Sequence, residues 1–251
     1  MQAIDIVPTW REGDIFLCSH PKSGRTWIKQ FLAQYLSLTF SLGYREDFDL
    51  IDLMRIVPSE WALRLQPESP KRSYLKNPAV PRVRFSHYGF HRIFIGRPVI
   101  WLTRGVEDTL VSMWHDGGRQ GKIGDFVREK VGGYIDWMTG WIAGIPQASR
   151  WLHVTYEELS AGAQKGFRDI LEFIGLPFDS PHFFTATYRA SFDKMKKDEE
   201  GTTVERVRRG IVGGYRDELS PGDIKFIRNA VRAGGDALCF YCGVSKEESD
   251  D

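Results

Sequence analysis

The segment from Asp14 to Leu36 constrains the fold of this chain more than any other. It begins with four apolar residues, Ile15 to Cys18, which are typical of a buried strand. A short turn follows, and then apolar residues recur at the spacing of an amphipathic helix. A strand, a tight turn and a helix N-terminus in this order favour an anion site. The first N–H groups of a helix lack partners within it, and its dipole is positive there.

The turn itself carries side chains that suit an anion. Lys22 and Arg25 supply two positive charges, and Ser23 and Thr26 supply two hydroxyl donors. Gly24 has no side chain, so the backbone can approach a ligand closely. The sequence therefore predicts that a phosphate-like group binds to residues 22–26.

The order of residues in this turn argues against a nucleoside-triphosphate loop. Such a loop needs the pattern G-x-x-x-x-G-K-[ST], in which the lysine follows the second glycine. Here Lys22 precedes Gly24, and Ser19 and His20 fill the place where the first glycine is required. Taken alone, the turn fits either a generic phosphate- or sulfate-binding loop or a more specialised one.

The composition is that of a soluble globular protein. The 251 residues suffice for one sizeable core or two small ones, and 42% of them are hydrophobic and 27% charged. The net charge of +1 gives no general attraction to nucleic acid or to a membrane surface, so neither is expected as a partner. An anion site in this chain must therefore arise from a local cluster of basic residues.

The cysteines and the N-terminus favour a reducing compartment. Three cysteines do not make a disulfide framework, and the lone C-x-x-C of Cys239 and Cys242 favours two buried thiols over a zinc or redox site. The first residues resemble no export signal, and no window approaches about 18 uninterrupted apolar residues. We expect a cytoplasmic protein without a membrane segment.

Further along the chain, apolar runs alternate with helical patterns. Strands are predicted at residues 82–87, 98–103 and 151–155. Helices are predicted at residues 106–114, 123–131, 134–145, 164–174, 181–188 and 220–233, with Gly132 and Gly133 separating the second from the third. This alternation predicts an α/β fold. We expect a single domain over residues 1–251, with a mostly parallel central sheet flanked by helices and a P-loop-like phosphate-binding strand-turn-helix.

Three segments lack a clear periodicity. Residues 41–81 contain five prolines and are expected to form a lid or a wall of the substrate site. Residues 190–209 are highly charged, so we expect them to be mobile and to become ordered only with a ligand. The acidic tail, from about residue 245 to 251, is expected to be frayed.

Two further basic features follow the first helix. Arg104 stands where a strand gives way to a helix that carries Ser112, and ligands bind at such strand ends in parallel sheets. An arginine there can hold a phosphate with a bidentate fork. Arg208 and Arg209 precede Gly210 at the start of a glycine-rich turn. Each feature alone also fits an ordinary ion pair or a solvated basic run.

Five short motifs occur in one order along the chain. They are PKSGRTW (21–27), VIWLTRGVEDTLVSMW (99–114), YEEL (156–159), SFDKM (191–195) and RRGIVGGY (208–215). In this order they resemble the motifs of the sulfotransferases that use 3′-phosphoadenosine 5′-phosphosulfate (PAPS), and the resemblance covers residues 14–219. Five motifs together are far more specific than any one of them.

The resemblance implies a role for each matched residue. The 5′-phosphosulfate would be held by Lys22, Ser23, Gly24, Arg25 and Thr26. The adenine would be stacked by Trp27 and Phe192, with Tyr156 at its edge. The 3′-phosphate would be held by Arg104, Ser112, Arg208, Arg209 and Gly210. PAPS is then the co-substrate and PAP, 3′-phosphoadenosine 5′-phosphate, is the product, and sulfuryl transfer of this type requires no metal.

A base must take the proton of the acceptor as it attacks sulfur. The resemblance implies that this base is His87, at the end of the strand at residues 82–87, and an unperturbed pKa near 6.5 suits the task. His91 and His20 are the alternatives. We expect in-line transfer to a hydroxyl or amine of a small-molecule acceptor. Lys22 would be catalytic because it stabilises the charge on the bridging oxygen.

The sequence departs from the family pattern at several positions. Arg25 replaces a threonine, and Phe85 stands where many relatives carry a lysine. Gly214 and Tyr215 replace an Asp-Trp pair. The dimerisation element of many relatives is not recognisable, so their dimer is not carried over and the oligomeric state stays open.

Two other functions compete with this enzyme. One is a phosphoadenosine-binding protein that has lost catalysis, against which the intact Lys22 and His87 argue. The other is a P-loop nucleotide kinase, against which the position of the lysine argues. Residues 41–81 and 126–141 are expected to line the acceptor pocket, but they do not identify the acceptor.

Overall fold

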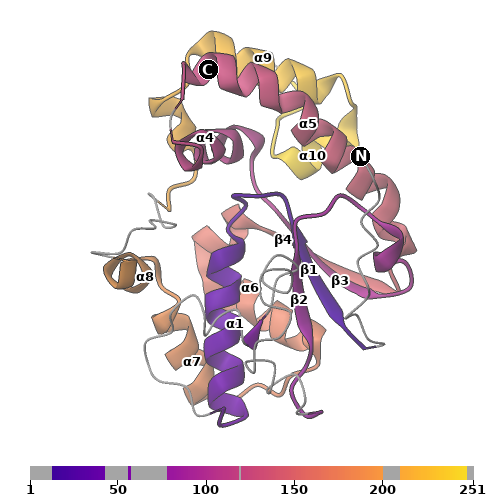
Figure 1. Cartoon of the computed structure of the whole chain (residues 1–251), viewed down its shortest axis with the longest axis vertical. Coiled ribbons are helices and arrows are strands. Elements are labelled where there is room, and N and C mark those ends of the chain that lie inside the picture. Colours follow the sequence, from indigo (N-terminus) through magenta and orange to yellow (C-terminus); the bar gives the residue numbers. More distant parts are fainter. Residues whose placement is uncertain (1–12, 43–55, 58–77, 119, 200–209, 248–251) are drawn as a thin grey trace.

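A four-stranded parallel sheet forms the centre of the computed structural model, which describes residues 13–42, 56–57, 78–118, 120–199 and 210–247 (Figure 1). Its strands are β1 (Ile15–Ser19), β2 (Val83–Ser86), β3 (Pro98–Thr103) and β4 (Arg150–Thr155). Every pairing is parallel, and the order across the sheet is β2-β1-β3-β4. The predicted α/β fold with a parallel sheet is confirmed.

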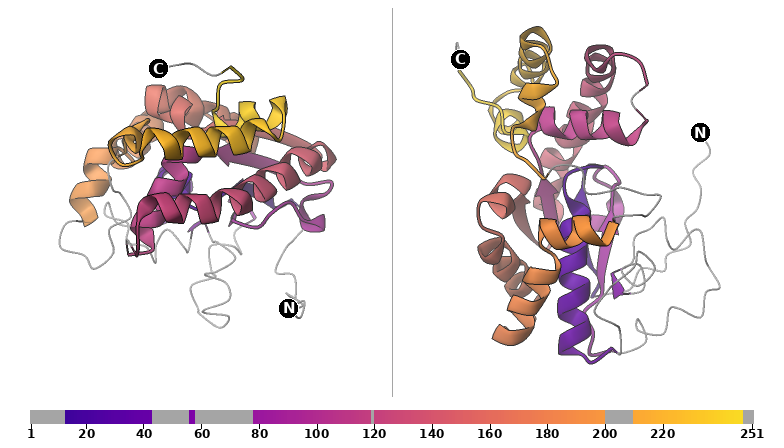
Figure 2. Two further views of the ribbon diagram at one scale, coloured as in Figure 1. Left: turned by 90° about the horizontal axis from the view of Figure 1, so that it is seen from above. Right: turned by 90° about the vertical axis from the view of Figure 1, so that its left-hand side faces the viewer.

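Helices cover both faces of this sheet. They are α1 (Arg25–Thr39), α4 (Val106–Asp116), α5 (Ile123–Gly144), α6 (Tyr156–Ile174), α7 (Ser180–Arg189), α8 (Phe192–Glu199), α9 (Pro221–Arg232) and α10 (Asp236–Cys242), with the short 3₁₀ helices η2 (Arg92–Phe94), η3 (Ile145–Gln147) and η4 (Gly214–Asp217). In β1, Ile15 and Leu17 pack with α1, α6 and α7, whereas Phe16 and Cys18 pack with α4, α5, α9 and α10. Figures 1 and 2 show these two groups of helices at opposite ends of the molecule. Alternate residues of one buried strand thus join two hydrophobic clusters.

Helix α5 is continuous, so the prediction of two helices separated by Gly132 and Gly133 is wrong. Both glycines lie on the exposed side of the helix. The residues around them, Val131, Tyr134 and Met138, keep one buried face at helical spacing. Each glycine costs about 1 kcal/mol relative to alanine in a helix, and burial of this apolar face outweighs that cost.

Helix α6 begins at Tyr156, eight residues before the predicted start at Gln164. Thr155 caps it, because its hydroxyl accepts a hydrogen bond from the Glu158 backbone N–H while the Glu158 carboxylate accepts one from the Thr155 backbone N–H. Gly162 departs from helical geometry, with φ −173° and ψ 79°. This kink breaks the helical periodicity, so the sequence pattern predicts only the second part of the helix.

The later elements differ from expectation at two places. Residues 192–199 form α8, whereas they were expected to be irregular, and residues 200–209 lie outside the described residues. Helix α10 was not predicted. It carries Cys239 and Cys242, both buried and free of disulfides, as is Cys18 in β1. Burial raises the pKa of the Cys242 thiol to about 12, so this thiol stays protonated at neutral pH.

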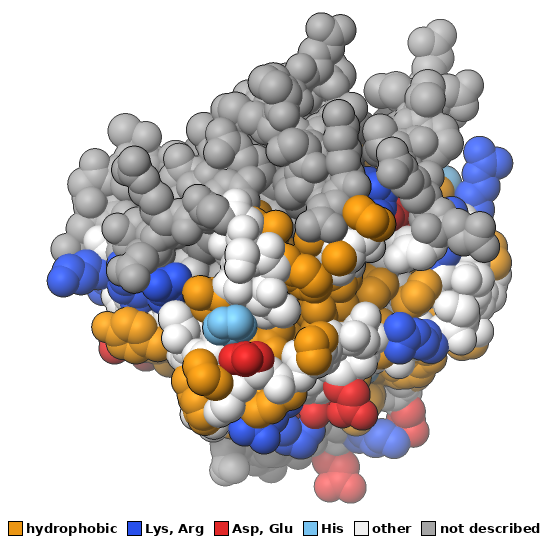
Figure 3. All heavy atoms as spheres, turned by 90° about the horizontal axis from the view of Figure 1, so that it is seen from below, with side chains coloured by type: hydrophobic (Ala, Val, Ile, Leu, Met, Phe, Trp, Pro, Cys, Tyr) orange, Lys and Arg blue, Asp and Glu red, His pale blue; other side chains and the backbone are white. Residues whose placement is uncertain are grey.

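The surface carries charges of both signs. Figure 3 shows one face on which basic and acidic side chains lie among hydrophobic ones. None of the helices in the described ranges is both long and apolar enough to cross a membrane. The same part of the chain holds no cluster of three or more histidine, cysteine, aspartate or glutamate residues that could bind a metal ion.

Candidate active site

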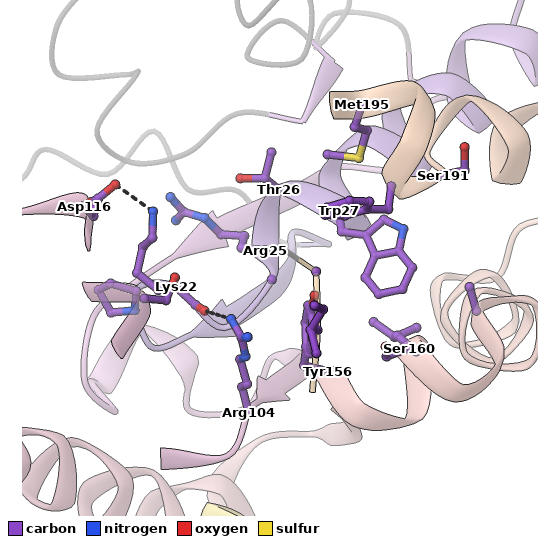
Figure 4. Close-up of a pocket in the computed structure, with 18 of the residues that line it drawn as sticks. Lys22, Arg25, Thr26, Trp27, Arg104, Asp116, Tyr156, Ser160, Ser191 and Met195 are labelled. Atoms are coloured by element: carbon purple, nitrogen blue, oxygen red, sulfur yellow. Dashed lines mark hydrogen bonds and ion pairs between the residues drawn. The ribbon is translucent and has the colours of Figure 1, made fainter. Parts of the chain in front are cut away.

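The topology of the sheet brings two predicted anion-binding segments together. The chain moves from β1 to its neighbour β2 on one side, and then crosses to β3 on the other side of β1. The carboxyl ends of β1 and β3 therefore lie at the point where the strand order reverses, which is where ligands bind in such sheets. Here the Arg104 guanidinium, after β3, donates a hydrogen bond from Nη1 to the Lys22 carbonyl, after β1, at 3.1 Å (Figure 4).

The turn after β1 has an unusual backbone. Lys22 and Gly24 both have positive φ, 67° and 92° respectively, and Gly24 is the N-cap of α1 without a side-chain cap. A Cβ on Gly24 would lie 2.4 Å from the Tyr156 ring. Glycine is thus required here both for its backbone angles and for the close approach of Tyr156. Gly24 has no side chain that could cap α1, and the N-terminus of a helix favours a bound anion through its first N–H groups and the positive end of its dipole.

A cavity of about 730 Å³ opens at this point. The residues that line it and were predicted for the site are Lys22, Gly24, Arg25, Thr26, Trp27, His87, Arg104, Ser112, Tyr156, Phe192 and Gly210. The residues that line it and were not assigned a role are Pro21, Asp116, Leu159, Ser160, Ala163, Thr187, Ser191, Met195 and Ile211. Ser23 is fully buried and does not line the cavity, and Arg208 and Arg209 lie outside the described residues.

Two buried polar atoms, one in the turn after β1 and one after β3, suit an anionic ligand. Arg104 Nε and the Ser23 hydroxyl are buried, and within the described residues neither has a hydrogen-bond partner. Unpaired buried donors are rare in folded proteins and are costly. The Arg104 guanidinium also lies over the Tyr156 ring, 4.3 Å from its centroid. This contact and the hydrogen bond to the Lys22 carbonyl together hold the orientation of the guanidinium.

Aromatic side chains form the other end of the cavity. The rings of Trp27 and Tyr156 meet edge to face, with centroids 5.7 Å apart. A Cβ on Gly210 would lie 2.3 Å from the Phe192 ring, and Gly210 has a φ of 66°. Figure 4 shows Trp27, Ser160 and Met195 on the opposite side of the drawn site from Lys22 and Asp116. The cavity thus has a basic end and an aromatic end, which is the arrangement that a phosphorylated heterocycle needs.

The hydrogen bonds of His87 define its tautomer. His87 follows β2, and its Nδ1 lies 2.8 Å from the Ser19 carbonyl oxygen. A carbonyl can only accept, so Nδ1 carries the proton and Nε2 carries the lone pair. Burial, the nearby Arg25 charge and, to a smaller extent, His20 and Lys22 lower the pKa of His87 from 6.5 to about 3. At neutral pH this imidazole is therefore uncharged.

Neither of the alternative histidines lines the cavity. His20 packs edge to face against Tyr134 and Trp137, with centroids 4.7 and 5.4 Å away. Burial lowers its pKa to about 4. His91 is exposed and caps η2, where its Nδ1 accepts a hydrogen bond from the Ile93 N–H. Of the three candidates for the base, only His87 faces the cavity.

An ion pair that the sequence did not predict lies inside the cavity. Lys22 Nζ donates to Asp116 Oδ1 at 2.7 Å. Asp116 is the last residue of α4 and lies four residues after Ser112, so both project from the same face of the helix. That spacing is the signal from which Asp116 could have been found.

Two carboxylates hold the segments around the cavity in place. The Asp108 carboxylate accepts hydrogen bonds from the Gly213 N–H at 2.6 Å and the Tyr215 N–H at 3.0 Å, which ties the glycine-rich segment to α4. Glu157 accepts a hydrogen bond from the Gly105 N–H at 3.0 Å, next to Arg104. These residues position others and do not line the cavity themselves.

Helix α5 contacts the site through hydrogen bonds to the backbone that follows β2. None of its residues lines this cavity, although residues 126–141 were expected to line an acceptor pocket. Instead, Trp137 Nε1 donates to the His87 carbonyl at 3.1 Å and Trp141 Nε1 donates to the Tyr88 carbonyl at 3.0 Å. The other expected wall, residues 41–81, falls mostly outside the described residues.

Known proteins show similarity in sequence to this chain. A family model described as a sulfotransferase domain matches residues 12–237. The chain is 25% identical over 189 residues to a flavonol 4′-sulfotransferase of Flaveria chlorifolia, and 25% identical over 220 residues to cytosolic sulfotransferase 17 of Arabidopsis thaliana. These matches cover 67% and 78% of this chain, respectively. In both cases the chain spans 57% of the length of the relative.

Solved structures show similarity in fold. Mouse sulfotransferase SULT7A1 complexed with PAP has a TM-score of 0.65 at 19% identity, over 89% of this chain and 84% of that one. Retinol dehydratase in complex with androsterone and PAP has a TM-score of 0.64 at 17% identity, over 89% and 81%. The family model runs through β1, its turn, α4 and α6, the elements that build the cavity, and the chain therefore belongs to the sulfotransferase domain family.

Proposed function

We propose that this protein transfers a sulfuryl group from PAPS to a hydroxyl or an amine of a small-molecule acceptor. The observation that carries the proposal is that one cavity joins the basic turn, Arg104, the aromatic residues and His87. The family supports it, as do the names of the relatives, among them a flavonol sulfotransferase, and the PAP bound to two structural neighbours.

The turn after β1 would hold the 5′-phosphosulfate. Lys22 and Arg25 supply charge, Ser23 and Thr26 supply hydroxyl donors, and Gly24 opens the backbone at the start of α1. Charge-assisted hydrogen bonds from such groups are the strong ones, and the positive end of the α1 dipole adds to them. The Ser23 hydroxyl is buried and has no hydrogen-bond partner among the described residues, which fits this role.

The 3′-phosphate would lie near the carboxyl end of β3. Arg104 would pair with it through its guanidinium fork, and its buried Nε, which lacks a partner among the described residues, suits a phosphate oxygen. Ser112 and Gly210 line the cavity and would contribute donors. Arg208 and Arg209 are proposed for this phosphate from the sequence alone.

The adenine would lie at the aromatic end. Trp27 and Phe192 line the cavity there and would stack on the base, with Tyr156 at its edge. Stacking between an aromatic side chain and a base is worth about 1–3 kcal/mol. The orientation of Tyr156 is fixed by its contacts with Trp27 and Arg104.

In the reaction the acceptor oxygen or nitrogen attacks sulfur while the bond from sulfur to the bridging phosphate oxygen breaks. His87 Nε2 takes the proton of the acceptor, and PAP leaves with the bridging oxygen. The anionic donor offsets the Arg25 and Lys22 charges that contribute to the low pKa of His87, so donor binding raises that pKa and makes His87 a stronger base. Lys22 stabilises the charge that develops on the bridging oxygen.

The cellular location is proposed from the names of the relatives, and the partners are proposed from the net charge. Several relatives are named cytosolic sulfotransferases, and we propose a cytoplasmic location here. The net charge of +1 gives no reason to propose nucleic acid or a membrane as a partner. We propose one domain over the chain, because both hydrophobic clusters share the same sheet.

Transfer of labelled sulfate tests this function. Incubation of the protein with ³⁵S-PAPS and a metabolite extract should produce labelled acceptors, and Lys22→Ala should weaken both PAP binding and the rate. PAP binding with no transfer to any acceptor would instead favour a non-catalytic phosphoadenosine-binding protein. Magnesium-dependent ATP turnover would favour a nucleotide kinase.

A further inference from the structure

Asp116 stands out among the residues that line the cavity. It carries the only carboxylate among the described lining residues, and it lies where a highly anionic donor is proposed to bind. A carboxylate there repels the donor, so its presence needs an explanation. Its partner is Lys22, and the Lys22 side chain is 22% exposed while that of Asp116 is 60% exposed.

We propose that Asp116 is a positioning residue that competes with the donor for the Lys22 ammonium and thereby sets the affinity for PAPS and PAP. This inference rests on the proposed function. Asp116 Oδ1 accepts a hydrogen bond from the Lys22 ammonium at 2.7 Å, and this is an ion pair between the two side chains. When the donor binds, its 5′ anion takes over the ammonium.

The arrangement of the turn explains why the two anions compete. The Lys22 carbonyl accepts a hydrogen bond from Arg104, which restrains the backbone, whereas the long lysine side chain can adopt other rotamers. Figure 4 shows Asp116 on one side of Lys22, and Arg104 and Tyr156 on the other. The ammonium therefore turns toward Asp116 or toward the donor. Two anions that share one ammonium at close range also repel each other.

The energetic consequence is a penalty on binding. The free energy of the Lys22–Asp116 pair must be given up before Lys22 can bind the donor, and the apparent affinity falls by the corresponding factor. The same penalty applies to PAP, so the pair also promotes product release. Release of product limits the rate of many enzymes.

The first test is the binding of PAP to Asp116→Asn by isothermal titration calorimetry. Exposed ion pairs are worth up to about 1 kcal/mol, so PAP should bind about two- to fivefold more tightly to the variant than to the wild type. Asp116→Glu keeps the charge and should bind PAP as the wild type does. The matched control is Asp169→Asn, which breaks another 2.7 Å lysine–carboxylate pair, with Lys165, away from the cavity. This control should leave PAP affinity unchanged.

A double-mutant cycle separates this competition from simple repulsion. In a Lys22→Met background, Asp116→Asn should give a clearly smaller gain in PAP affinity than in the wild-type background, because only the direct repulsion between Asp116 and PAP remains once the lysine is gone. An equal gain in both backgrounds would show that Asp116 acts on the donor directly, which overturns the proposal. No gain in the wild-type background would overturn it as well.

The choice of ligand gives an independent check. Adenosine 3′-phosphate lacks the 5′ anion, so its affinity should be the same in wild type and Asp116→Asn; a gain equal to that for PAP would contradict the proposal. If Asp116→Asn does not fold, as judged by circular dichroism, Asp116→Ser serves in its place. Failure of the wild type to bind PAP would refute the proposed function, whereas PAP binding that is indifferent to Asp116 would refute this inference alone.

Discussion

His87 shows how a single residue can be prepared for proton transfer. The Ser19 carbonyl accepts its Nδ1 proton, which directs the lone pair to Nε2, and Trp137 holds its backbone carbonyl. Both contacts are made by groups that do not line the cavity. The orientation of the imidazole is therefore built into the fold before any ligand binds.

Replacement of His87 tests its role as the base. His87→Ala should reduce the rate of sulfuryl transfer by about 10²–10⁴-fold, since this is the usual contribution of a general base. PAP affinity should stay within about threefold, because His87 acts on the acceptor. His91→Ala, an exposed histidine outside the cavity, is the control and should retain the full rate. A normal rate in His87→Ala would place the base elsewhere.

The low pKa of His87 also predicts how stability depends on pH. Its pKa is about 3 in the folded chain and near 6.5 when unfolded, so between these values the unfolded chain binds more protons. The stabilising contribution is thus complete above pH 6.5 and is lost as the pH falls through this window. Denaturant titrations at pH 7 and pH 5 should show that wild type loses up to about 2 kcal/mol more than His87→Gln. His20, with a pKa of about 4, contributes equally to both proteins. Equal losses would contradict the buried, neutral state of His87.

Arg104 is expected to distinguish ligands by their 3′ end. Arg104→Ala should weaken PAP binding by about 10- to 100-fold, since a hydrogen-bonded charge pair is worth about 1.5–3 kcal/mol. AMP, which lacks the 3′-phosphate, should lose little affinity. Arg104→Lys keeps the charge but removes the bidentate guanidinium. Its affinity for PAP should therefore lie between that of the wild type and that of Arg104→Ala. An equal loss for PAP and AMP in calorimetry would contradict the assignment.

At the scale of elements, the site depends on where strands end. The turn after β1 and the residue after β3 were predicted from local patterns, because a buried apolar run, a glycine turn and a helical period are all written within a short stretch of sequence. The sequence did not predict which residues pair with one another across the site. Lys22 and Asp116 are 94 residues apart, and Gly213 and Asp108 are 105 apart. No local pattern encodes such pairs.

The contact between Asp108 and the glycine-rich segment gives a prediction at this scale. Asp108→Asn weakens the acceptor for the Gly213 and Tyr215 N–H groups, and should lower the free energy of unfolding by about 1–3 kcal/mol. It should also weaken PAP binding, because Gly210 and Ile211 on this segment line the cavity. Asp125→Asn, at an exposed position in the first turn of α5, is the control for charge. Unchanged stability and affinity in Asp108→Asn would show that the segment holds its place without this contact.

Two helices show why sequence periodicity can fail. Gly132 and Gly133 suggested a break in α5, but they face solvent while the buried face continues past them. Tertiary packing decided the outcome, and glycine propensity did not. In α6 the opposite happened, since the distortion at Gly162 hid a helix whose capping box at Thr155 and Glu158 could have predicted its start.

On the scale of the whole molecule, net charge says little about the ligand. The chain carries +1, yet Lys22, Arg25 and Arg104 line one cavity. These residues come from separate segments, and the reversal of strand order between β1 and β3 brings them together. The sequence motifs predicted a set of site residues, while the shape of the cavity and the pairing of Lys22 with Asp116 required the fold.

The central claim is that one cavity recognises both anionic ends of a phosphoadenosine. Calorimetric titration of the wild-type protein with PAP, AMP and adenosine 3′-phosphate tests this directly. PAP should bind most tightly, and loss of either phosphate should weaken binding by about tenfold or more, since each phosphate has its own charged partners. Equal affinities for the three nucleotides, or no binding of PAP, would contradict the account.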